Sequence, residues 1–388
     1  MSYNQIILPQ VLKARAISLR QLSQRLKISA DELRQQLEKQ PQPAQSLLNA
    51  IAEELALPSF VFFMGAPPTL SDAMPDFRSP AGAPSAKSKE TLKSLNFSRG
   101  IQRAAVEAKA SKTQIPRLSV SELVAAALKS REFFGIDIED QKSAKDARAF
   151  YNVCRKKIED KGLFVLRDSF PQEDGSGYCL AHDVVPLVVV NTRRQGPSRQ
   201  LFTLVHELAH ALIGKTGISD PFERHNAIEV QCNKFAAEFL IPKTYVAALL
   251  GPLFPSRPLD PTPDDVASAA RRLKVSHEAT ALRLEELGLY RPGSYKKWKQ
   301  LVHNDNPDFN KPRGGNASGE PVPQEKVKLA KFGFRFASVF SRGIASGTIS
   351  DLDLYRSSGL KPKYQNTYFD YARSLTSEEL QSLGDGDD

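Results

Sequence analysis

Two histidines and a glutamate stand within one helical turn of each other in a mostly apolar stretch, LFTLVHELAHALIG, at residues 201–214. On a helix, His206 and His210 project from one face, so both imidazoles can bind a single ion from adjacent turns. Glu207 lies beside them, within reach of a metal-bound water. Imidazole and carboxylate ligands with one open position are typical of catalytic zinc. The HExxH pattern therefore predicts a zinc site with Glu207 as general base.

The same stretch also fits a core helix that carries two histidines without a metal. Leu201, Leu204 and Leu208 supply the apolar face that such a helix would bury. However, two buried imidazoles without partners would be costly. Burial of this helix therefore favours the metal site over the purely structural interpretation.

A second amphipathic helix, IEVQCNKFAAEFLIP at 228–242, is the predicted source of the third ligand. Glu229 lies in its first turn and Asn233 follows one turn later. A carboxylate ligand paired with a group that orients a ligating histidine is expected in such sites. Glu229 is therefore the preferred third ligand, with Glu238 and His225 as alternatives.

The predicted chemistry is peptide hydrolysis. Zinc lowers the pKa of a bound water from about 15.7 to roughly 7, and Glu207 would take the proton and pass it to the leaving amine. An oxyanion also needs a stabilising donor. Tyr178, His182 and His225 are candidates from flanking loops, although each also has a structural interpretation.

The order of predicted elements is α+β: helices, then short strands in LFVLRDSF and PLVVVN, then helices again. The segment 177–191 is expected to form a hairpin or small sheet that leads into the 201–214 helix. Two Pro-, Gly- and Ser-rich stretches divide the chain into units. We expect a helix-turn-helix domain at 1–65, a linker at 66–118, a central domain at 119–250 that carries the HExxH helix, a helical extension at 251–302, a second linker at 303–326, and a helical C-terminal region with an acidic tail at 327–388.

The N-terminal leucine pattern predicts two helices joined by a three-residue turn, as in a helix-turn-helix. Ser18 is expected to cap the first helix, and Ser29 with Glu32 to form a capping box for the second. That second helix carries acidic residues that would face a polyanion, and it offers few readers of DNA. The acidic residues are Asp31, Glu32 and Glu38, and the candidate readers are Arg34, Gln35 and Gln36.

Composition restricts the class of protein. Of the 388 residues, 41% are hydrophobic and 25% are charged, as in a soluble globular protein. The three cysteines lack CxxC spacing, so we expect buried, reduced thiols. With no leader or membrane-spanning run, we expect a cytoplasmic protein without membrane contact. The net charge of +9 leaves DNA as a partner open. The oligomeric state is not predicted.

The segment from Gly177 to Pro242 resembles the ImmA/IrrE family of metallopeptidases. It contains, in order, a strand ending in Asn (VVVN), the basic loop TRRQGPSR, the HExxH helix and the Glu-initiated helix ending in Pro. The resemblance implies a gluzincin-like α+β domain with His206, His210 and Glu229 as zinc ligands and Glu207 as base. Ile241 stands where methionine is common in the family.

Residues 19–63 resemble the phage-repressor helix-turn-helix of the Xre/Cro type, which reads DNA with its second helix. Together the resemblances imply a zinc endopeptidase that cleaves a regulatory protein, such as a transcriptional repressor, in stress response or mobile-element regulation. The alternative is a DNA-binding regulator or antitoxin with a zinc-binding sensor domain. A third interpretation is an interaction scaffold with a metal-stabilised core.

Overall fold

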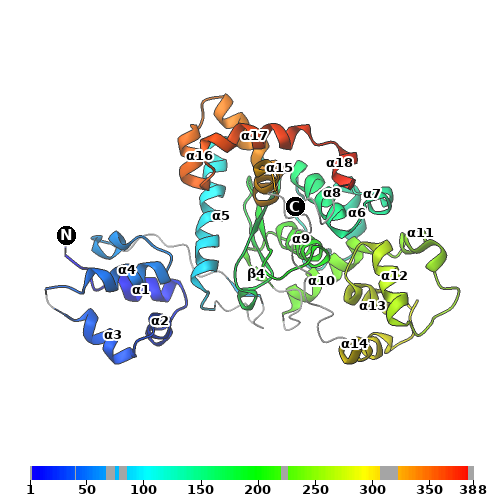
Figure 1. The fold of residues 1–388 in the computed structure, drawn as a ribbon, viewed down its shortest axis with the longest axis horizontal. Coiled ribbons are helices and arrows are strands. Elements are labelled where there is room, and N and C mark those ends of the chain that lie inside the picture. The colour runs from blue at the N-terminus through cyan, green and yellow to red at the C-terminus, as the bar shows by residue number, and fades with distance from the viewer. Residues whose placement is uncertain are drawn as a thin grey trace.

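The computed structural model describes residues 2–39, 41–66, 75–77, 85–219, 226–305 and 322–382. Helices surround one central four-stranded sheet (Figure 1), so the predicted α+β class is confirmed. Within these described ranges no helix is both long enough and apolar enough to cross a membrane.

The N-terminal unit consists of helices packed around their own apolar core. Ser18 forms the predicted cap, and Gln21 completes a capping box with it. Ser29 caps the next helix by accepting the N–H of Glu32, but the predicted reciprocal box is wrong, because the Glu32 carboxylate accepts from Gln36 instead. The elements are α1 (Ile7–Ala14), α2 (Leu19–Leu26), α3 (Ala30–Leu37), α4 (Gln45–Glu54) and a 3-10 helix, η1 (Ser59–Phe63).

The structure differs from the expected linker at 66–118, because α5 (Lys89–Glu107) lies within it. Ser88 caps this helix, and Leu92, Leu95 and Ile101 recur at helical spacing on its buried face. The Pro- and Ser-rich residues before it conceal this periodicity in the composition. In Figure 1, α5 stands between the N-terminal unit and the sheet.

The central sheet has the strand order β1-β3-β2-β4. β2 and β3 form the expected antiparallel hairpin, β1 runs parallel to β3, and β4 pairs antiparallel with the free side of β2. Successive residues of each strand face opposite sides, as strand geometry requires. The bounds are β1 (Phe164–Asp168), β2 (Gly177–Leu180), β3 (Leu187–Asn191) and β4 (Gly217–Ser219), with a 3-10 helix η2 (Gln172–Asp174) before β2.

One face of the sheet packs on the helices that carry the candidate site. Val165, Cys179 and Val188 point into this core, which continues into the 251–302 extension. All three cysteines are buried and unpaired, as expected. The helices on this side are α6 (Ala127–Phe133), α7 (Ile138–Ser143), α8 (Ala147–Asp160), α9 (Pro197–Leu212), α10 (Ala227–Leu240), α11 (Val246–Leu250), the 3-10 helix η3 (Gly251–Leu253), α12 (Pro263–Leu273), α13 (His277–Glu286) and α14 (Ser294–Asp305).

The opposite face of the sheet is covered by α5 and the C-terminal helices. Phe164, Tyr178 and Val189 point into a core shared with Phe336 and Phe340. The region 327–388 was expected to be a separate C-terminal region. In its described part it forms the second layer over the central sheet, as Figure 1 shows for α15 and α17. The helices are α15 (Gln324–Ala345), α16 (Asp351–Ser358), α17 (Pro362–Ser374) and α18 (Ser377–Ser382).

A buried carboxylate joins the two layers. Glu159 of α8 accepts the backbone N–H of Val165 at 3.2 Å and that of Phe334 at 2.8 Å. The second bond is available because Gly333 departs from helical geometry at φ +81° and kinks α15. Arg155 lies 3.6 Å from the same carboxylate. Glu159 thus anchors the kink of α15 to the end of α8.

The Glu159 anchor predicts a pH dependence of stability. Burial outweighs Arg155 and the two backbone bonds and raises the pKa of Glu159 from 4.5 to about 7. A carboxyl with a raised pKa in the folded protein retains its proton longer than in the unfolded chain, so the unfolding free energy falls as pH rises from about 4.5 to 7. This shift corresponds to roughly 3 kcal/mol.

In urea titrations across that pH window, Glu159→Gln should therefore show a flatter stability profile than the wild-type protein. Glutamine keeps an oxygen acceptor but does not titrate. Parallel profiles for the two proteins would contradict the assigned pKa.

Candidate metal centre

Helix α9 holds the HExxH residues rigidly against the sheet. It begins at Pro197, whose missing N–H costs nothing at the first helical position. Its leucines pack into the core beneath the sheet, and His206, Glu207 and His210 are fully buried with them. The helix is therefore a core helix and a platform for polar groups at once.

The structure brings together three of the residues singled out from the sequence: His206, His210 and Glu229. The Nε2 atoms of the two imidazoles lie 3.2 Å apart. The Glu229 carboxylate lies 3.2 Å from His206 Nε2 and 3.0 Å from His210 Nε2. One candidate ligand atom from each residue lies within 4.8 Å of the others, as a shared metal ion would require.

The two imidazoles and the Glu229 carboxylate form a set of ligand atoms that suits a bound cation. Asn233 Oδ1 accepts from His206 Nδ1 at 2.9 Å, so Nδ1 carries the proton and the Nε2 lone pair of the neutral ring faces the centre. Among the described residues, neither Glu229 oxygen has an aligned hydrogen-bond donor, and the contacts to the rings are ion-pair distances. Converging lone pairs of nitrogen and carboxylate oxygen, all buried, form an arrangement that a divalent cation stabilises.

Protonation and metal binding compete at this cluster. Burial alone would raise the pKa of Glu229, but the two imidazoles outweigh it and lower that pKa to about 2. Burial alone would lower the pKa of His206, but the Glu229 carboxylate outweighs burial and raises it. For His210, burial prevails and lowers the pKa. A proton and a cation compete for the same Nε2 lone pairs, so cation binding weakens at acid pH.

Glu207 is held beside the cluster by the end of the sheet. The Ser219 hydroxyl of β4 donates to Glu207 Oε1. Gly177 of β2 makes room for this carboxylate, because a Cβ there would lie 2.8 Å from Glu207 Oε1. Two neighbouring strands thus fix the orientation of the acidic group that the HExxH pattern singled out.

The alternatives for the third ligand fare differently. Glu238 forms an ion pair with Arg283 of α13 and accepts the backbone N–H of Lys243 at 3.2 Å, so its carboxylate is engaged elsewhere. His225 lies outside the described residues. Of the carboxylates considered from the sequence, Glu229 is the one that contacts the histidines.

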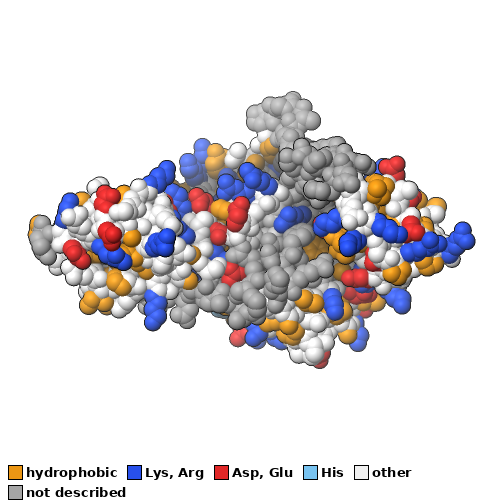
Figure 2. All heavy atoms as spheres, turned by 90° about the horizontal axis from the view of Figure 1, so that it is seen from below, with side chains coloured by type: hydrophobic (Ala, Val, Ile, Leu, Met, Phe, Trp, Pro, Cys, Tyr) orange, Lys and Arg blue, Asp and Glu red, His pale blue; other side chains and the backbone are white. Residues whose placement is uncertain are grey.

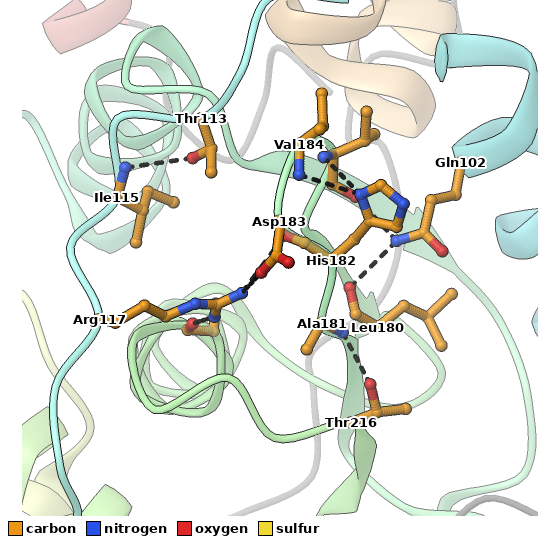
Figure 3. A network of polar contacts seen from close by, with 12 residues as sticks. Gln102, Thr113, Ile115, Arg117, Leu180, Ala181, His182, Asp183, Val184 and Thr216 are labelled. Carbon is orange, nitrogen blue, oxygen red and sulfur yellow. Dashed lines mark hydrogen bonds and ion pairs between the residues drawn. The ribbon is translucent and has the colours of Figure 1, made fainter. Parts of the chain in front are cut away.

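The candidates for oxyanion stabilisation have structural partners. The Tyr178 hydroxyl shares hydrogen bonds with Ser94 at 2.8 Å and Ser98 at 2.9 Å, both on α5, within the core on the other face of the sheet. His182 Nδ1 accepts the N–H groups of Val184 and Val185, each at 3.0 Å, and so shapes the β2–β3 turn (Figure 3).

Arg117 connects the same β2–β3 turn to helix α9. It donates to Asp183 at 3.1 Å and to the carbonyl of Ala211 at 2.7 Å (Figure 3). The hairpin is thereby bound to the C-terminal end of the HExxH helix. His182 and its neighbours support the platform and do not reach the cluster in this network.

Two residues at the cluster were not predicted. Ser219 lies in a three-residue strand without a readable pattern, and Phe77 lies in a Pro-rich stretch assigned to a linker. The Phe77 ring stacks on His210, with centroids 4.9 Å apart and planes 6° from parallel. No local sequence signal pointed to either contact, since both depend on the tertiary arrangement.

Comparison with known families covers this region. Residues 158–285 match the peptidase M78 family model, described as an IrrE N-terminal-like domain. The match runs from the end of α8 to α13, so it includes the whole sheet, the cluster and much of the helical extension. Comparison with curated proteins gives no significant match.

Proposed function

We propose that the protein is a zinc-dependent endopeptidase, because its residues 158–285 match the family model of the peptidase M78 (IrrE N-terminal-like) domain. The observation that carries the proposal is the convergence of His206, His210 and Glu229 with Glu207 fixed beside them. These are the residue types, in the spatial relation, that HExxH hydrolysis needs.

In the proposed reaction, His206, His210 and Glu229 hold the ion. When bound, zinc supplies Lewis-acid chemistry, which makes a water acidic near neutral pH and polarises a peptide carbonyl. Asn233 fixes the His206 ring in the tautomer that leaves Nε2 free to ligate. Glu207 accepts the proton of the attacking water and later donates it to the leaving amine. Ser219 keeps the Glu207 carboxylate oriented during both transfers.

We further propose a regulatory protein, such as a transcriptional repressor, as the substrate, and the cytoplasm as the place of the reaction. The N-terminal helical unit supports a role in recognition. The DNA-binding alternative has weaker support, because Asp31 and Glu32 lie in the first turn of α3 and would repel the phosphates of DNA. On the face drawn in Figure 2, basic and acidic side chains lie interspersed over this unit, without a single basic stripe.

Metal titration tests the proposal directly. Purified protein should contain about one zinc per chain, and Glu229→Gln should lose most of it because one ligand charge is removed. Asn233→Ala should retain the site but weaken zinc affinity by about 10–100-fold, since the His206 ring loses its orienting partner. Competition with a chromophoric chelator measures both changes.

The matched control is Glu238→Gln on the same helix, which should leave zinc affinity unchanged because its carboxylate pairs with Arg283. Protein prepared without chelators that holds neither zinc nor another divalent metal would refute the metal centre.

A further inference from the structure

A short segment of the expected linker pairs with the edge of the sheet beside the cluster. β4 is the last strand of the order β1-β3-β2-β4, so its outer side is an open edge. Asp76 forms a parallel bridge with Ile218. The N–H of Ile218 donates to the carbonyl of Pro75 at 2.9 Å, and the N–H of Phe77 donates to the carbonyl of Ile218 at 2.9 Å. Pro75–Phe77 thus lies on β4 as an added strand, the way extended peptides bind to sheet edges.

The Phe77 side chain enters the candidate site. It is 6% exposed, yet it belongs to none of the three hydrophobic cores formed by the described residues. Its ring is buried against the His210 imidazole instead. The ring also contacts Gly217, where an added methyl group would overlap it. Gly217 and His210 therefore form a notch that accepts a flat aromatic side chain next to the metal ligands.

Asp76 forms a buried ion pair with Lys87. Its carboxylate lies 2.6 Å from Lys87 Nζ, and both side chains are nearly fully buried. Lys87 directly precedes Ser88, which caps α5, and the Lys87 carbonyl accepts Arg25 of α2 at 2.8 Å. The acidic position of the segment is therefore recognised by a fixed lysine, and that lysine is also tied to the N-terminal unit.

We propose that the outer edge of β4 is the peptide-binding edge of the enzyme and that Pro75–Phe77 occupies it in cis. This inference rests on the proposed endopeptidase function and specifies its substrate class: an extended segment with an acidic residue followed by an aromatic one. The acidic side chain pairs with Lys87, and the aromatic ring fills the notch of Gly217 and His210.

Occupation in cis reduces the affinity for any external peptide. A tethered segment competes at an effective concentration that reaches the millimolar range for short tethers. The apparent association constant for an external peptide then equals the intrinsic constant multiplied by the fraction of molecules in which the edge is free.

Peptide binding tests this inference. The probe is a fluorescein-labelled peptide of sequence DAMPDFRSPA, which repeats residues 72–81, measured by anisotropy in the Glu207→Gln background so that it is not cleaved. Phe77→Ala should bind the probe at least about tenfold more tightly than the parent, because the cis segment competes less. A probe with alanine in place of its phenylalanine should bind neither protein.

The control variant is Phe60→Ala, at a phenylalanine of η1 that is 65% exposed. It should bind the probe as the parent does. Hydrogen exchange gives a readout without a ligand: the Ile218 amide, which donates to Pro75, should exchange at least about tenfold faster in Phe77→Ala.

Gly217→Ala separates the notch from the segment. Its methyl group blocks the notch for both the cis segment and the probe. The Ile218 amide should therefore exchange faster, while the probe binds no more tightly than it does to the parent. Equal probe affinity in Phe77→Ala and the parent, or an Ile218 amide unaffected in both variants, would overturn the inference. Zinc content is measured on the same samples, so loss of the metal proposal is seen separately from loss of peptide binding.

Discussion

Replacing Glu207 by glutamine should reduce peptide cleavage by about 10²–10⁴-fold while zinc content stays at the wild-type level. Glutamine is nearly the same size and retains an oxygen that can accept the Ser219 hydroxyl, so the local packing around α9 survives. It lacks a group that can take a proton from water near neutral pH. The ligand atoms on His206, His210 and Glu229 are untouched, and so metal affinity should be preserved.

The measurement needs a substrate, and the same variant supplies one. Glu207→Gln retains the binding surfaces but turns over slowly, so it should capture a protein that the wild-type enzyme then cleaves. Cleavage of that protein by both forms gives the rate ratio, and zinc is measured by elemental analysis of the same preparations.

Ser219→Ala is a useful second variant, because it leaves the Glu207 carboxylate in place but removes the hydroxyl that orients it. A loss clearly smaller than that of Glu207→Gln is expected. If Glu207→Gln cleaved the captured protein at the wild-type rate with zinc bound, the assignment of the base would be wrong.

The candidate site was predictable only where its residues lie on helices. The i, i+4 spacing of His206 and His210 places both on one face of α9, and the same spacing of Glu229 and Asn233 suggested a ligand and its orienting partner on α10. The structure brings these four side chains into contact.

Sequence spacing carries no such information for β4 and the Pro75–Phe77 segment. A strand of three residues shows no alternation, and Phe77 is more than 130 positions from His210 along the chain. Its contact depends on where the chain crosses a sheet edge, which no local pattern encodes.

The second layer of the fold was hinted at in the strands. LVVV in β3 is apolar at successive positions, which is typical of a strand buried on both faces. The HExxH helix was the evident partner for one face of the sheet, but the strand pattern does not indicate which segment packs on the opposite face. α5, which precedes the sheet in the sequence, and α15, which follows it, pack on this opposite face. The amphipathic pattern of each helix does not reveal which surface it packs against.

Phe336→Ala should therefore destabilise the peptidase domain itself, by about 3–5 kcal/mol, although this residue lies more than 120 positions beyond the HExxH motif. Phe336 is fully buried, and its ring lies 4.6 Å from that of Phe332 and 4.4 Å from that of Phe340. These rings cover the face of the sheet opposite to α9. Truncation leaves a cavity that the packed aromatic cluster cannot close.

Urea unfolding followed by circular dichroism and by zinc release distinguishes a shared core from an independent C-terminal domain. With a shared core, Phe336→Ala lowers the midpoint of both signals together, because the sheet that positions Glu207 loses its second layer. With an independent domain, the circular dichroism would show an early transition while zinc release kept the wild-type midpoint. Phe60→Ala, at an exposed position, should move neither signal.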